Sequence, residues 1–299
     1  MIRSWLYRAD VKASPYAYVL PFFLLFAALG AFPILYTGWV SLHDWSLLED
    51  QHTFLGLGNY AELLGDSYFW NALFNTVSIL ILSTVPQLLL ALLLAHVLNG
   101  RLRGQTFWRV SMLLPNITSV VAVAIIFGQL FGRDYGVVNW LLGLFGVGQI
   151  DWAAGTATSH IAISTMVIWR WTGYNALIYL AAMQAVPQSL HEAAIIDGAT
   201  SLQRLRKITI PAIRPTIIFT VIVSTIGGMQ MLAEPLLFGG GQPTGGNDHQ
   251  FQTLTLYLFE AGFGRFDFGY ASATAWLMFV VIVIAAGINY LFVRRIRSS

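Results

Sequence analysis

Six of the polar and aromatic residues inside long apolar segments are candidates for a substrate path, because a polar side chain there is costly unless it meets a partner or a water-filled path. They are Asn75, Trp171, Tyr174, Asn175, Gln230 and Glu234. Three of them, at 171, 174 and 175, fall within about one turn of a helix. Gln230 and Glu234 are spaced i and i+4, so in a continuous helix they share a face. A sugar would suit such a path, because aromatic faces stack on sugar rings, and amides and carboxylates pair with hydroxyls.

Other roles remain open for these polar residues. Asn side chains between membrane helices often serve only to join helices, so Asn75 and Asn175 can be helix contacts or substrate contacts. Glu234 can instead be a solvated helix end near the outer interface. Arg170 is expected to pair with a carboxylate or to reach backbone carbonyls.

Enzyme chemistry is not indicated. A phosphate-binding loop ends in Gly-Lys-Ser/Thr, but the two lysines, Lys12 and Lys207, follow Val11 and Arg206. His191-Glu192 begins a zinc-protease signature, yet Ile195 stands where the second histidine is required. There is no cysteine. We therefore expect no catalytic residue, metal or cofactor in this chain, and any ATP hydrolysis must belong to a separate chain.

The composition is that of a polytopic membrane protein. The 299 residues are 57% hydrophobic and 10% charged, with a mean hydropathy of +0.66. Six apolar segments have the length of a membrane span: 15–42, 71–98, 108–131, 160–186, 212–238 and 271–293. The connections are too short to fold alone, so residues 1–299 are expected to form a single membrane domain. A glycine-rich stretch, 239–248, is expected to be a loop.

The distribution of basic residues predicts the orientation. Alternate connections hold 13 of the 16 Lys and Arg residues: 1–14, 99–109, 187–214 and 294–299. By the positive-inside rule, these segments and both termini are cytoplasmic. The polar stretch 187–211 therefore faces the compartment that holds ATP.

Residues 187–211 predict a helix, a glycine turn and a second helix. Ser189 and Glu192 form a potential capping box, and Gly198 permits the turn that ends the first helix. Thr200 with Gln203 repeats the box, and the second helix is expected to end at Pro211. By itself, this element could also be a helical connection without further function.

The same stretch resembles the EAA loop of the membrane subunits of binding-protein-dependent ABC importers. The matching residues are Glu192, Ala193, Ala194, Asp197, Gly198, Ala199, Ile208, Ile210 and Pro211. In that family the loop is the coupling helix, which docks in a cleft of a cytoplasmic ATPase. The resemblance therefore assigns ATPase coupling to positions 192–194 and 197–199.

The resemblance covers most of the chain and extends to the carbohydrate-uptake branch of these permeases. Further matches are Asn59-Tyr60, Phe69 to Ala72, Asn75-Thr76, Arg103-Gly104, Phe107 to Arg109, Leu114-Pro115, Trp169 to Gly173, Ala181 to Gln184, Gly239 to Gly241 and Gly269 to Ala273. Their order is similar to that of the maltose-type first permease subunit. Tyr174 and Gln230 fall where similar permeases place sugar contacts. One departure is Gln242 before Pro243, where the branch has Gly-Pro, which implies a changed turn.

This resemblance implies an all-α fold of six transmembrane helices, the type I ABC importer permease fold, in the plasma membrane of a prokaryote. Its implied partners are a second permease subunit, a cytoplasmic ATPase dimer that holds ATP and Mg, and an extracellular solute-binding protein or lipoprotein. It implies no nucleic-acid partner. The expected function is uptake of a sugar or oligosaccharide.

Two other functions are compatible with parts of the sequence. The scaffold could carry another solute, such as glycerol phosphate or a polyol, but a phosphate ester calls for several basic residues along the path and only Arg170 is available. A secondary transporter would need coupling carboxylates and inverted repeats, and would leave the 187–211 element unexplained.

Overall fold

The computed structural model describes residues 2–46, 52–100 and 103–297. Its long elements are helices, as predicted for an all-α membrane protein. The chain divides into two compact units, which we describe separately. The first consists of Met1–Leu63 and Ala261–Trp276, and the second of Leu64–Glu260 and Leu277–Ser299.

The first unit begins with one long apolar helix. It runs through α1 (Ile2–Phe26), the π-helical turn η1 (Ala27–Ala31) and α2 (Phe32–Val40). The π turn lies just before Pro33, whose missing N–H cannot bond to the carbonyl four residues earlier. The unit also contains the hairpin β1 (His43–Asp44) and β2 (Thr53–Phe54), α3 (Gly58–Gly65), most of η3 (Glu260–Gly264) and the start of α15 (Phe268–Arg297).

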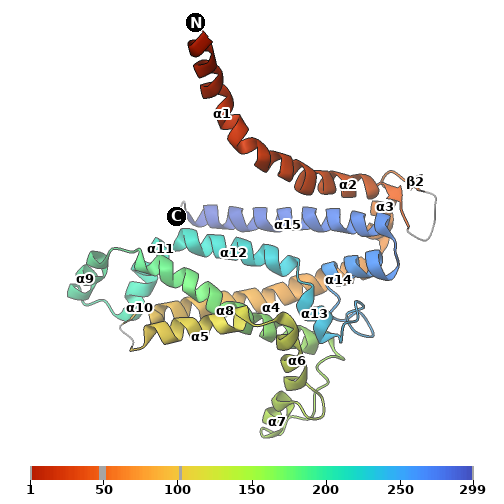
Figure 1. Ribbon diagram of the computed structural model, residues 1–299. Coiled ribbons are helices and arrows are strands. Elements are labelled where there is room, and N and C mark those ends of the chain that lie inside the picture. Colours follow the sequence, from red (N-terminus) through yellow and green to blue (C-terminus); the bar gives the residue numbers. More distant parts are fainter. Residues whose placement is uncertain (1, 47–51, 101–102, 298–299) are drawn as a thin grey trace. The chain divides into compact units, whose positions relative to one another are not determined.

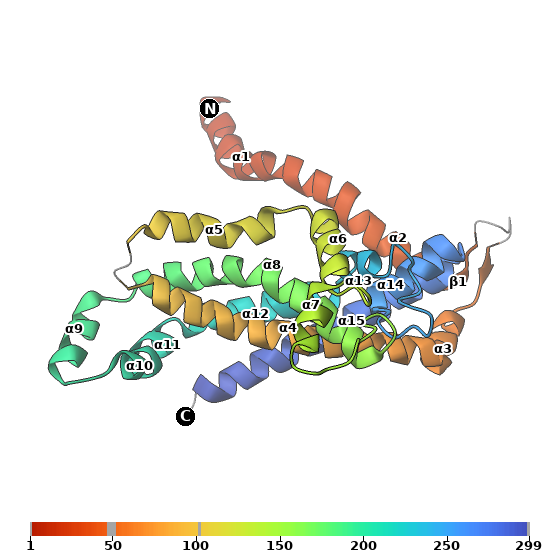
Figure 2. The ribbon, with the colours of Figure 1, turned by 90° about the horizontal axis from the view of Figure 1, so that it is seen from below.

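The second unit is a helical bundle built on α4 and α8. All helices of this unit up to α14 are given below in chain order (Figures 1 and 2). They are α4 (Ser67–Leu98), α5 (Gln105–Ile117), α6 (Val120–Leu130), α7 (Val137–Gly143), α8 (Thr156–Gln184), α9 (Gln188–Ile196), α10 (Ser201–Arg204), η2 (Leu205–Thr209), α11 (Ile210–Ala212), α12 (Arg214–Met229), α13 (Ala233–Phe238) and α14 (Leu254–Phe259). Helices α5 and α12 pack against α8 and α4.

Small residues let α4 and α8 approach closely. Ala91 and Ala95 of α4 and Ala176 of α8 are fully buried in one apolar cluster. Leu205 and Ile213, which follow α10, belong to the same cluster. The base of the α9–α10 element is therefore part of the bundle core, while α9 and α10 project beyond one end of it (Figures 1 and 2).

Within the part of the chain that the structure describes, three helices are long and apolar enough to cross a membrane: Ser14–Val40, Ser67–Leu98 and Phe268–Tyr290. Two bent helix pairs raise the count to as many as five. The structure thus agrees with a multi-pass membrane protein, while the number of six spans rests on the sequence.

The apolar segment 108–131 does not form one straight helix. Helices α5 and α6 meet at an angle of 89°. Thr118 has an extended backbone, and its hydroxyl donates to the carbonyl of Leu114 at 2.7 Å. The backbone N–H of Thr118 donates to the same carbonyl at 3.1 Å. Bonding of a threonine hydroxyl to the carbonyl four residues earlier often accompanies a bend in a helix.

The continuous helix predicted for 212–238 is wrong. It is interrupted between Met229 and Ala233. Pro235 lacks the N–H that would bond to the carbonyl of Met231 in an unbroken helix. The hydroxyl of Thr253 donates to that carbonyl instead, at 2.9 Å. The interruption is therefore held by a side chain from a distant part of the sequence.

Candidate functional site

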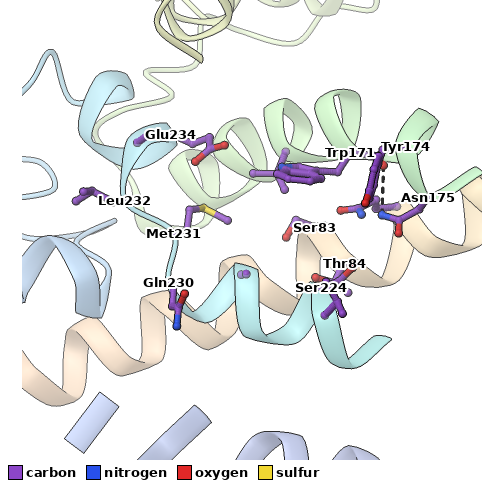
Figure 3. A pocket seen from close by; sticks show the side chains of 16 residues that line it. Ser83, Thr84, Trp171, Tyr174, Asn175, Ser224, Gln230, Met231, Leu232 and Glu234 are labelled. Atoms are coloured by element: carbon purple, nitrogen blue, oxygen red, sulfur yellow. Dashed lines mark hydrogen bonds between the residues drawn. The ribbon is translucent and has the colours of Figure 1, made fainter. Parts of the chain in front are cut away.

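A pocket of about 390 Å³ lies among α4, α8, α12 and the interrupted segment before α13. Figure 3 shows it from close by. Its volume is within the range of roughly 300–1,000 Å³ that is usual for small-molecule sites. The lining residues are Ser83, Thr84, Gln87, Val167, Trp171, Tyr174, Asn175, Val223, Ser224, Gly227, Gly228 and Gln230 to Glu234. Five of the six residues predicted for a sugar path are among them.

Helix α8 contributes the aromatic side of the pocket. The rings of Trp171 and Tyr174 meet edge to face, with centroids 5.9 Å apart. Both rings are partly exposed, whereas Asn175 is buried and donates from Nδ2 to the carbonyl of Trp171 at 3.3 Å. The two rings thus stay accessible, and the oxygen of the Asn175 amide is not used by that bond.

The interrupted segment contributes Gln230 and Glu234. Because the helix ends at Met229, these two residues do not share a helical face, and the sequence prediction on this point is wrong. They reach the same pocket through the irregular backbone between α12 and α13. Irregular backbone is tolerated in membrane proteins where it lines a cavity, and this segment lines the pocket.

Glu234 is buried and ionically paired. Its Oε1 lies 2.6 Å from Nη1 of Arg170, with side-chain exposures of 11% and 13%. The prediction that Arg170 pairs with a carboxylate is confirmed. The alternative that Glu234 is a solvated helix end is wrong, because the ion pair holds α13 against α8 and removes the carboxylate from bulk water.

Asn75 lies outside this pocket. Its side chain is fully buried, and its Nδ2 donates to the carbonyls of His249 and Gln252 at 2.8 and 3.1 Å. His160 of α8 bonds through Nε2 to the carbonyl of Gln250 at 3.0 Å. Of the two roles left open for Asn75, the structure supports a contact that holds the loop before α14 on the bundle.

Helix α4 also contributes to the pocket, and this contribution was not predicted from the sequence. Gln87 is 3% exposed and lines the pocket together with Ser83 and Thr84. A signal was present, because Gln87 is a polar amide within an apolar segment and directly follows Pro86. Ser224 of α12 was missed in the same way.

Gly228 has a packing role between α12 and α4. A Cβ atom at this position would lie 2.3 Å from Cδ1 of Leu80. Glycine therefore allows α12 to approach α4 closely at the pocket wall. A Cβ at the neighbouring Gly227 would meet no atom within 4 Å, and Gly227 also lines the pocket.

The second candidate site is the α9–α10 element. Gly198 has φ of +75° and follows α9, as predicted. The N–H of Ala199 bonds to the carbonyl of Ala194 at 2.8 Å, and that of Gly198 to the carbonyl of Ile195 at 3.0 Å. This pair of bonds is a Schellman motif, which fixes the direction in which the chain leaves the helix.

The helix-start prediction was right for α10 and wrong for α9. Thr200 and Gln203 form both bonds of the capping box. By contrast, α9 begins at Gln188 with Pro187 at its N-cap, so Ser189 lies inside the helix and caps nothing. Helix formation continues past Pro211 to Ala212, because the π turn η2 precedes the proline.

The α9–α10 element exposes a mixed surface. Glu192, Ala193, Asp197 and Gly198 are exposed, and Ala194 and Ala199 are half-buried. Ile196 is 86% exposed. At its base the element is tied to the bundle by His96 of α4, whose Nε2 lies 3.1 Å from Oγ of Ser201. Within the described residues, no group of three or more His, Asp or Glu side chains could hold a metal ion.

The chain is similar to known transporter subunits. Residues 72–298 match the family model described as binding-protein-dependent transport system inner membrane component. The trehalose/maltose transport system permease protein MalF of Thermococcus litoralis is 32% identical over 284 residues, 95% of this chain and 94% of that one. The lactose transport system permease protein LacF of Rhizobium radiobacter is 37% identical over 241 residues, 79% of this chain and 80% of that one.

A solved structure has the same fold. It is a crystal structure of a bacterial alginate ABC transporter in complex with an alginate pentasaccharide-bound periplasmic protein. The TM-score is 0.82 at 23% identity, covering 97% of this chain and 98% of that chain. The family predicted from the EAA-like residues is confirmed by these matches. This chain belongs to the binding-protein-dependent transport system inner membrane components, and is thus a membrane-embedded transporter permease subunit and not an enzyme.

Proposed function

We propose that this chain is one of two permease subunits of an ATP-driven ABC importer that takes up a sugar or oligosaccharide delivered by an extracellular binding protein. The observation that carries the proposal is the pocket, where two accessible aromatic rings, three amides and a carboxylate converge from four elements. Ring faces bind the apolar faces of sugars, and amides and carboxylates bind their hydroxyls. Relatives named for trehalose/maltose, lactose and arabinooligosaccharide transport support the same substrate class.

The charge of the pocket favours a neutral solute over a phosphate ester. None of the described residues that line it is Lys or Arg. Arg170, directly behind the wall, is compensated by Glu234 at 2.6 Å. A glycerol phosphate would therefore meet no uncompensated cation here, whereas sugar hydroxyls find several acceptors.

The α9–α10 element is proposed to couple transport to a separate cytoplasmic ATPase dimer, which holds ATP and Mg. Its contact residues are Glu192, Ala193, Ala194, Asp197, Gly198 and Ala199. Exposed apolar side chains beside them, such as Ile196, fit a partner better than water. A displacement of α9 would reach the pocket helices because Leu205 and Ile213 lie in the core between α4 and α8.

The proposed topology has six spans in one membrane domain, with both termini and α9–α10 cytoplasmic, in the plasma membrane of a prokaryote. We expect a cysteine at Arg204 to react with an impermeant maleimide only from the inside, and a cysteine at Asn247 only from the outside. Asn247 is exposed, whereas a Cβ at neighbouring Gly245 would lie 2.3 Å from Cα of Gln252, so that position is unsuitable. The natural chain has no cysteine, so each label reports a single site. Inside-only labelling at 247 would contradict six spans.

The pocket is tested by two alanine variants. The stack on Tyr174 and a hydrogen bond to Gln230 are each worth about 1 kcal/mol, and about 1.4 kcal/mol is a factor of ten. We expect Tyr174→Ala and Gln230→Ala each to weaken uptake of labelled sugar several-fold to tens-fold. Sugar binding to the separate binding protein should not change.

The matched control is Tyr290→Ala. Tyr290 is a 57% exposed tyrosine on α15 that does not line the pocket. Uptake is measured at saturating binding protein in the reconstituted complex. If Tyr174→Ala and Gln230→Ala both keep wild-type uptake, the sugar site lies in the second permease and not in this pocket.

A further inference from the structure

The Arg170–Glu234 pair differs from an ordinary surface ion pair. Its two side chains are almost completely buried in the wall of the pocket. A second ion pair, Arg133 with Asp151, has an N–O distance of 3.5 Å and side-chain exposures of 64% and 40%. Burying two charges carries a desolvation cost, and an apolar pair could join two helices without it. A role in the pocket explains why the charges are present.

The pair occupies only part of the Glu234 carboxylate. Arg170 reaches Oε1 through Nη1, while its Nε is buried and has no hydrogen-bond partner in the described part of the chain. The contact is therefore not a bidentate pair in which Nε and an Nη atom of the guanidinium both bond to the carboxylate. An ionised carboxylate has about four lone-pair sites on its two oxygens. Acceptor capacity remains on a residue that lines the pocket.

Arg170 orients two pocket groups at once. Its Cζ lies 5.9 Å from the centroid of the Trp171 ring, while its Nη1 bonds to Glu234. In the view of Figure 3, Trp171 lies between Glu234 and the pair Tyr174 and Asn175. A carboxylate beside an aromatic face can accept hydroxyl protons from a sugar whose ring rests on that face.

We propose that this pair sets the charge selectivity of the pocket. Glu234 is the specificity-determining acceptor for substrate hydroxyls, and Arg170 is the positioning residue that holds the carboxylate and cancels its charge. The carboxylate oxygens of Glu234 repel an anionic solute, and the described residues that line the pocket include no Lys or Arg to attract it. The pocket therefore prefers neutral solutes with several hydroxyl groups. This inference rests on the proposed function and adds the chemical basis of its selectivity.

The test compares a neutral sugar with its own acid. Equilibrium binding is measured on the purified complex of this chain with its second permease and ATPase, without binding protein, so that only the pocket selects. The probes are labelled maltose, lactose and arabinotriose, each with the aldonate made by oxidising its reducing end. For the neutral sugar that binds best, we expect the wild-type complex to prefer it over its aldonate.

Glu234→Gln removes the charged acceptor and leaves Arg170 uncompensated. We expect Kd for the neutral sugar to rise about tenfold, as for loss of a hydrogen bond to a charged group. The preference for neutral sugar over aldonate should fall by about tenfold or more, because Arg170 can then attract the acid. Arg170→Lys keeps both charges and should preserve most of the wild-type preference. The surface pair variant Arg133→Gln/Asp151→Asn should bind as wild type.

A variant with one unpaired buried charge can fail to assemble, so the double variant Arg170→Gln/Glu234→Gln is included. It carries no buried charge and should assemble, yet bind the neutral sugar about tenfold more weakly. Wild-type affinity and wild-type preference in the double variant would show that the pair only joins helices, and would overturn the inference. If the wild-type complex binds none of the sugars, the proposed function fails and this inference fails with it.

Discussion

A Gly198→Val chain is expected to reach the membrane and assemble with its partners, but to lose nearly all ATP-driven uptake while ATP hydrolysis continues. Gly198 has φ of +75°, and a Cβ there would meet no atom within 4 Å. The strain is thus confined to the turn: a left-handed residue with a side chain costs roughly 1–2 kcal/mol, and more when it is β-branched. The Schellman motif would open, and α9 would lose its fixed direction relative to α10.

The matched control for this strain is Gly146→Val. Gly146 has φ of +77° and also has open space around it, but it lies in the connection between α7 and α8. The same backbone cost there should leave the ratio of sugar imported to ATP hydrolysed unchanged. If Gly198→Val also keeps the wild-type ratio, α9–α10 does not couple the two processes.

Glu192→Lys tests the same element without backbone strain. Glu192 is exposed on α9, so the reversed charge should not affect folding. If Glu192 contacts the ATPase, a lysine leaves a charge against the partner's complementary surface and weakens docking. We expect the same separation of ATP hydrolysis from uptake as in Gly198→Val.

The second large effect is expected for Gly173→Ala. A Cβ at Gly173 would lie 1.8 Å from the carbonyl oxygen of Met112, which is backbone of α5 and cannot turn aside as a side chain can. Helices α5 and α8 would have to separate along their contact. Overpacking of this kind costs about 3 kcal/mol or more.

The measurement is thermal unfolding of the purified complex in detergent, where Gly173→Ala should lower the melting temperature by several degrees. Gly287→Ala is the control, because Gly287 lies in helix α15 with no atom within 4 Å of its Cβ position. Equal melting temperatures for the two variants would contradict the close approach of α5 to α8.

Local sequence rules worked where the deciding contacts are local. The Thr200–Gln203 box and the glycine turn at 198 depend on bonds within a few residues, and both are present. The Ser189–Glu192 box has the same spacing but does not form. Pro187 takes the N-cap position and starts α9 before Ser189, so the potential box lies inside the helix.

The lengths of the apolar segments predicted where the long helices lie, but they did not predict where those helices are interrupted. Residues 212–238 are apolar throughout, so hydropathy gives no boundary inside them. The interruption depends on Pro235 together with the hydroxyl of Thr253, which bonds to Met231 across 22 residues of sequence. A contact of that kind cannot be derived from periodicity.

The pocket was partly predictable because polar residues in apolar segments are costly. That rule found Trp171, Tyr174, Asn175, Gln230 and Glu234, and the structure brings them to one pocket. The rule did not separate these residues from Asn75, whose side chain bonds to the loop before α14. A polar residue in an apolar segment looks the same in the sequence whether it lines a pocket or holds a loop. The partner of Arg170 was predicted only as a type of residue, because its identity depends on how α13 packs against α8.

The most direct test of the account is to isolate the chain in mild detergent from its native membrane, identify what co-purifies, and measure sugar uptake by the material in proteoliposomes. The account predicts a second permease and an ATPase in the same particle, and uptake that requires ATP inside together with a sugar-loaded binding protein outside. A chain that purifies alone and moves sugar without ATP would contradict it.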